Sequence, residues 1–167
     1  MGLRKQGFRV LLVLAAFFCG LALVFVVIVY VAGFSPSPIG SATAAIGGSF
    51  HLQDENGRPV SDEDLKGHPF LVFFGFTHCP DVCPTTLFEI SQVMQRLGKD
   101  ADRSGALFIT VDPERDTPAV MKDYLSNFDP HLRGLTGDRA SINAAIKAYR
   151  VYAAKIPLEG GDYTMDH

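Results

Sequence analysis

The feature that most constrains this chain is an apolar run of 24 residues, Val10 to Gly33, that contains no charged side chain. As an α-helix it would be about 36 Å long, which is enough to cross the roughly 30 Å hydrocarbon core of a bilayer. The apolar part of a cleaved signal peptide is shorter, at about 7–15 residues. The run therefore predicts a retained transmembrane helix over residues 10–33, in preference to a signal peptide that is removed.

Basic residues stand on only one side of this run. Arg4, Lys5 and Arg9 precede it, and no Lys or Arg follows it until Arg58. Because basic residues stay on the cytoplasmic side of a membrane, residues 1–9 are predicted to be cytoplasmic and the rest of the chain to lie outside. We expect a single-pass protein of a bacterial inner membrane, with its folded part in the periplasm.

The remainder of the chain divides into a tether and one domain. Residues 34–49 (FSPSPIGSATAAIGGS) are rich in Ser, Pro, Gly and Ala, a composition typical of linkers. Residues 50–167 are long enough for one compact domain. The whole chain is 47% hydrophobic, has a net charge of −3 and contains three Cys. These values exclude a disordered chain, a disulfide-dense mini-protein and a protein that coats nucleic acid.

The domain alternates between strand and helix patterns. The continuous apolar runs 70–76 and 106–111 are typical of strands covered on both faces. Helices are predicted over 84–97, 118–128 and 140–148, where apolar residues recur at helical spacing. The other predicted elements are a hairpin over 50–60 with its turn at Gly57, a weak strand over 132–135 and a strand over 149–154. This alternation predicts an α/β sheet with helices on its faces.

Two cysteines, Cys79 and Cys83, lie where the first buried strand gives way to a helix. The free N–H groups at a helix N-terminus stabilise a thiolate, which is the form that binds metals and attacks disulfides. A disulfide across so short a loop would stabilise the fold by only about 2 kcal/mol, so a purely structural bridge is a weak explanation.

The residues alone leave three interpretations in which the cysteine pair is chemically active. The pair could exchange thiols and disulfides, since one helical turn brings residues four apart within bonding distance. Two thiolates with a third ligand such as His could hold Cu(I), whereas structural zinc would need four ligands. A peroxidatic thiol is the third interpretation, but the Thr that peroxiredoxins carry three residues earlier is replaced by Phe76 and Pro80.

Three separated motifs resemble those of one known family. The segments 75–87 (GFTHCPDVCPTTL), 111–118 (VDPERDTP) and 162–167 (DYTMDH) are similar, in this order, to the motifs of the Sco/SenC family of copper-binding, thioredoxin-like proteins. The resemblance extends over about residues 46–167. It implies a thioredoxin-like fold to which the hairpin over 50–60 is an N-terminal addition.

The resemblance also implies a ligand set and a function. The copper ligands would be Cys79, Cys83 and His167. Family members deliver copper to the dinuclear copper centre of cytochrome c oxidase, or reduce the cysteines of that centre before copper enters. The implied partners are the copper-bearing subunit of the oxidase, other copper chaperones and a thiol reductant. The alternative is a thioredoxin-like oxidoreductase acting on exported proteins, although such enzymes carry Cys-x-x-Cys, often after Trp, and this chain has no Trp.

Two further expectations concern the neighbours of this site. Family members continue past the last His with a strand pair and a helix, so we expect the fold to lack C-terminal elements and His167 to be poorly anchored. Asp112 and Asp116 are expected to serve as local turn and cap residues, in preference to a contact with the metal site or a partner. His51, His68 and His131 are expected to be ordinary surface residues, and His78 is expected to face solvent, in preference to tuning the Cys79 thiolate or binding a metal weakly.

Overall fold

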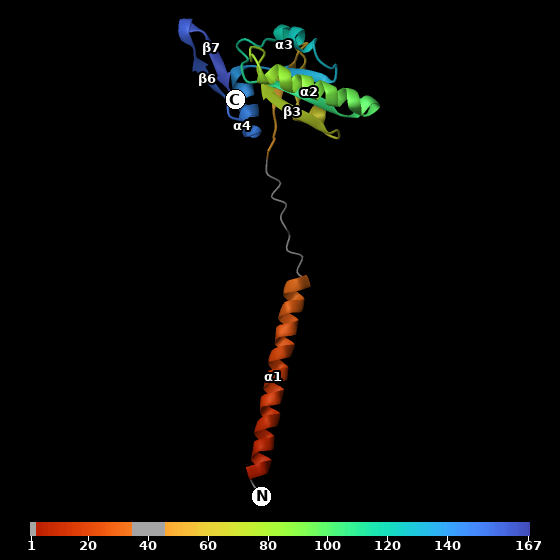
Figure 1. Ribbon diagram of the computed structural model, residues 1–167, viewed down its shortest axis with the longest axis vertical. Coiled ribbons are helices and arrows are strands. Elements are labelled where there is room, and N and C mark those ends of the chain that lie inside the picture. The colour runs from red at the N-terminus through yellow and green to blue at the C-terminus, as the bar shows by residue number, and fades with distance from the viewer. Residues whose placement is uncertain (1–2, 35–45) are drawn as a thin grey trace. The chain divides into compact units, whose positions relative to one another are not determined.

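The computed structural model describes residues 3–34 and 46–167, which form two separate units. The first is helix α1 (Leu3–Phe34), whose side chains are described for residues 14–30 (Figure 1). Within the described residues, no helix is both long enough and apolar enough to cross a membrane. The predicted anchor over 10–33 therefore stays a prediction, and most of the predicted tether lies outside the described residues.

In residues 46–167 the chain forms a five-stranded sheet with the order β2-β1-β5-β4-β3. Strands β3 (Phe70–Gly75), β4 (Gly105–Thr110) and β5 (Leu132–Thr136) are parallel neighbours. Strand β1 (His51–Asp54) is antiparallel to both β5 and β2 (Pro59–Ser61). The predicted hairpin is thus confirmed, and its turn contains Gly57 at φ 76°, a backbone conformation that favours glycine.

Helices cover both faces of this sheet (Figure 1). Helices α2 (Val82–Leu97) and α3 (Pro118–Leu125) lie on one face, and α4 (Arg139–Ala148) lies on the other. The side chains of the central strand β4 alternate between these two layers. Ala106 and Phe108 pack on the side of α2 and α3, whereas Leu107 and Ile109 pack on the side of α4. Short 3-10 helices span Asp62–Leu65, Gly98–Arg103 and Glu159–Gly161.

The predicted strand over 149–154 is wrong. Residues after α4 instead complete the end of that helix: Val151 donates a backbone hydrogen bond to Ile146, and Arg150 takes a φ of 55°. The strands lie later, at β6 (Ala154–Pro157) and β7 (Tyr163–Asp166), which pair antiparallel. Helix α3 also ends earlier than predicted, at Leu125. The β6–β7 hairpin forms a separate two-stranded sheet in the described part of the chain.

Candidate metal centre

The loop between β3 and α2 holds the two cysteines at a helix N-terminus. Cys83 lies in the first turn of α2 and is fully buried, whereas Cys79 lies in the preceding loop and is partly exposed. The backbone N–H of Cys83 points at Cys79, with 3.4 Å between the nitrogen and the sulfur. The free N–H groups of the helix therefore face the Cys79 sulfur, as the strand-to-helix position predicts.

The two thiols have opposite acidities. Partial burial opposes ionisation of Cys79, but hydrogen bonds from backbone N–H groups at the start of α2 outweigh it and hold its pKa below the ordinary value of 9.0. Burial, together with the nearby charges of Cys79 and Asp116, raises the pKa of Cys83 to about 12. The thiolate fraction at neutral pH is therefore larger for Cys79 than for Cys83.

His167 reaches this loop from the other end of the domain. Its Nε2 lies 3.5 Å from Sγ of Cys83, and its ring meets the Phe76 ring edge-on at a centroid distance of 5.5 Å. Within the described residues, no three His, Cys, Asp or Glu side chains are gathered closely enough to hold a metal ion. The structure thus places His167 beside Cys83, and the joint role of Cys79, Cys83 and His167 as ligands stays a prediction.

The buried carboxylate of Asp116 holds the cysteine loop in place. Asp116 is fully buried and accepts hydrogen bonds from the backbone N–H of Thr77 at 3.1 Å, from the Thr77 hydroxyl at 2.6 Å and from the Thr110 hydroxyl at 2.6 Å. The expectation that Asp116 is a local cap is therefore wrong, because its partners include a residue 39 positions away. Asp112 is also fully buried. A run of polar residues directly after a buried parallel strand is the sequence pattern that could have indicated both positions.

Comparison with known proteins gives a consistent result. The model of the SCO1/SenC family matches residues 40–167. The chain belongs to the SCO1/SenC family. Among curated relatives, an SCO2-like protein of Rickettsia felis is 41% identical over 124 residues, covering 73% of this chain and 60% of the relative. The mitochondrial SCO2 homologue of Danio rerio is 46% identical over 123 residues, covering 72% of this chain and 44% of the relative.

Solved structures support the same assignment. The structure of Bradyrhizobium japonicum ScoI with copper bound has a TM-score of 0.72 and 67% identity, covering 74% of this chain and 78% of that one. Yeast Sco1 with copper bound has a TM-score of 0.68 and 41% identity, covering 74% and 70%. The family resemblance and the thioredoxin-like α/β fold are thereby confirmed. The matched part of this SCO1/SenC chain corresponds to about half the length of the curated relatives above.

The four histidines other than His167 differ in their surroundings. His51, His68 and His78 are exposed, as predicted. His131 is only partly exposed, and its two ring nitrogens lie 2.7 Å from an oxygen of Asp129 and 3.1 Å from an oxygen of Asp102. The expectation of an ordinary surface residue is therefore wrong for His131, because the ring is held between two carboxylates.

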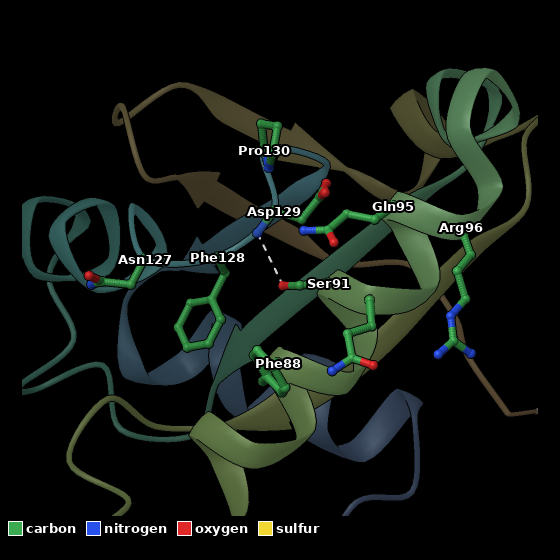
Figure 2. A pocket seen from close by; sticks show the side chains of 9 residues that line it. Phe88, Ser91, Gln95, Arg96, Asn127, Phe128, Asp129 and Pro130 are labelled. Atoms are coloured by element: carbon green, nitrogen blue, oxygen red, sulfur yellow. Dashed lines mark hydrogen bonds between the residues drawn. The ribbon is translucent and has the colours of Figure 1, made fainter.

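A pocket of about 640 Å³ opens between α2 and the segment that leads into β5, and Figure 2 shows its lining. Phe88 and Arg96 line it from α2, and Asn127 and Pro130 from the other wall. The backbone N–H of Asp129 donates to the Ser91 hydroxyl at 3.1 Å and ties the two walls together. None of the predicted metal ligands lines this pocket.

Proposed function

We propose that this SCO1/SenC chain is a copper-binding protein that delivers copper to the dinuclear centre of cytochrome c oxidase. Its ligands in this proposal are Cys79, Cys83 and His167. The observation that carries the proposal is the 3.5 Å approach of the His167 imidazole to the Cys83 thiol, beside the sulfur of Cys79. Two of the relatives described above are structures with copper bound.

The residues present fit copper as cargo. Two thiolates and one neutral imidazole are donors that suit Cu(I), and they accept Cu(II) when ligands are added or rearranged. Cys79 is partly exposed, so a partner can reach the site. Cys83 carries a proton in the metal-free state, since burial raises its pKa to about 12, and copper binding would release that proton.

The proposal includes membrane anchoring through residues 10–33. Large apolar side chains are exposed along the described part of α1, which suits a lipid environment better than water. The basic residues before the run favour a cytoplasmic N-terminus and a periplasmic domain at a bacterial inner membrane. A periplasm-active reporter enzyme fused after His167 should be active in cells, and an inactive, cytoplasmic reporter would contradict this orientation.

The decisive experiment measures copper in the reduced full-length protein, purified in detergent and loaded with Cu(I). The native protein should retain one tightly bound copper per chain. Cys79→Ser and Cys83→Ser should lose it. Cys19, the third cysteine, is exposed on α1, so Cys19→Ser is the matched control and should retain the copper. Retention of a tightly bound copper by both Cys79→Ser and Cys83→Ser would overturn the proposal.

Thiol–disulfide exchange is the second candidate function, and the contrast between the two thiols favours it. A partly exposed thiol of lowered pKa followed by a buried thiol of raised pKa is an arrangement for attack by Cys79 and resolution by Cys83. Such a reaction reduces a partner disulfide to two thiols and oxidises the pair to a disulfide. Reduction of an oxidised peptide carrying the two oxidase cysteines, with copper removed, separates this activity from delivery.

A further inference from the structure

The position of His167 depends on contacts that lie outside the main sheet. His167 directly follows β7, and in the described residues β7 pairs only with β6. Successive side chains of a strand point to opposite sides, so Tyr163, Met165 and the next alternate position, His167, share one side. Met165 is buried in the domain core and Tyr163 packs against the same core. The hairpin is therefore held to the domain by this side of β7.

We infer that Tyr163 and Arg115 are positioning residues for His167, an inference that rests on the proposed copper site. The Tyr163 hydroxyl donates to Oδ1 of Asp112 at 2.9 Å, and that carboxylate is fully buried. The backbone carbonyl of Tyr163 accepts a hydrogen bond from Arg115 at 3.0 Å. The hydroxyl and the backbone carbonyl of Tyr163 are thus both hydrogen-bonded to one short segment, residues 112–116.

Arg115 contacts Asp112, Tyr163 and Phe76 at the same time. Its Nε donates to Oδ2 of Asp112 at 2.5 Å, and its guanidinium carbon lies 3.8 Å from the centre of the Tyr163 ring. The same carbon lies 5.9 Å from the centre of the Phe76 ring, against which the His167 ring rests. The planar guanidinium therefore serves as a hydrogen-bond donor and as a stacking surface, two roles that Lys does not combine.

The segment 112–116 also holds the cysteine loop. Asp116 binds the backbone and hydroxyl of Thr77, which lies two positions before Cys79. Asp112 and Arg115 bind Tyr163, which lies four positions before His167. One segment thus sets the positions of the sulfur donors and of the nitrogen donor. Loosening the Tyr163 attachment should move His167 while the cysteines stay in place.

The test compares Tyr163→Phe with the control Tyr152→Phe in the full-length protein. Tyr163→Phe removes the hydrogen bond to Asp112 and keeps the ring, whereas Tyr152 is 63% exposed. In the reduced, metal-free protein, the nuclear Overhauser contact between the rings of His167 and Phe76 should weaken in Tyr163→Phe and persist in Tyr152→Phe. With Cu(II) bound, the nitrogen hyperfine splitting should weaken and copper affinity should fall about tenfold, as for partners of metal ligands.

A double-mutant cycle with His167→Ala separates positioning from general damage. If Tyr163 acts through His167, the variant Tyr163→Phe/His167→Ala should bind copper as His167→Ala does, with no further loss. Native ring contact and native affinity in Tyr163→Phe, alongside a loss in His167→Ala, would overturn the positioning inference and leave the copper site standing. Native affinity in His167→Ala, or no copper in the native protein, would instead overturn the proposed ligand set. Should Tyr163→Phe lose its fold, Arg115→Lys is judged by the same measurements.

Discussion

Nε2 of His167 lies 3.5 Å from Sγ of Cys83, although 84 residues separate the two positions. The cysteine is fixed in the first turn of α2, and the histidine is brought to it by a hairpin outside the main sheet. The two sides of the candidate site therefore depend on different parts of the fold. The two parts meet at residues 112–116, where Asp116 binds Thr77 of the cysteine loop and Asp112 binds Tyr163 of the hairpin.

Cys79 should react before Cys83 in the reduced, metal-free protein. Hydrogen bonds from α2 outweigh burial and lower the pKa of Cys79, whereas burial raises that of Cys83 to about 12. Because the thiolate fraction rises with pH and is one half at the pKa, Cys79 should reach half of its maximum alkylation rate at a pH below 9.0, its ordinary pKa. Iodoacetamide labelling with peptide mass spectrometry checks this. Protein unfolded in urea is the control, where both should react alike, and faster labelling of Cys83 in the native protein would contradict the assignment.

Gly75→Ala should disturb the cysteine loop. A Cβ at position 75 would lie 2.7 Å from Sγ of Cys83 and 2.8 Å from a ring carbon of Phe108, so one of them must move. We expect the free energy of unfolding in urea to fall by about 1–3 kcal/mol, with faster alkylation of Cys83. Gly105→Ala is the matched control, since a Cβ there meets nothing within 4 Å. Equal stability of the two variants would show that the space beside Cys83 is not limiting.

The buried strands and helices could be predicted because their patterns are local. The apolar run over 70–76 contains β3 (Phe70–Gly75), and the run over 106–111 nearly coincides with β4 (Gly105–Thr110). The strand predicted over 149–154 failed because apolar residues there end helix α4, with Arg150 at positive φ. Propensity does not distinguish a helix end from a short strand when tertiary contacts decide the backbone conformation.

The residues of the candidate site also divide into those that local sequence indicates and those that it does not. The position of Cys79 and Cys83 between a buried strand and a helix indicates reactive thiols, but His167 entered only through resemblance to a family motif. Asp116 was misinterpreted because sequence shows which residues are adjacent, whereas its hydrogen bonds reach Thr77 across the sheet edge. The pattern after β4 could have indicated the position of Asp116, but its partner Thr77 is known only when the loops that follow β3 and β4 are placed side by side.

Asp116→Ala should destabilise the domain. The carboxylate accepts three hydrogen bonds, and its loss leaves the Thr77 amide and two hydroxyls without their acceptor. Hydrogen bonds to a charged group are worth about 1.5–3 kcal/mol each, with partial recovery by water, so we expect a loss of about 2–3 kcal/mol in urea unfolding. Asp123→Ala removes an exposed carboxylate and should change stability little. A loss no larger than that of the control would mean that Asp116 does not hold the loop.

His131 should make the stability of the domain depend on pH. Hydrogen bonds to Asp102 and then to Asp129 raise its pKa above the ordinary value of 6.5. A raised folded-state pKa means that the folded protein binds the proton more tightly than the unfolded chain does. The stabilisation is therefore fully present below about pH 6.5 and is lost as pH rises through the folded-state pKa. His131→Gln should accordingly lower the free energy of unfolding more at about pH 5.5 than at about pH 8.5. The exposed His68→Gln should produce no such difference, and an equal effect of His131→Gln at both pH values would exclude the protonated ring as the source.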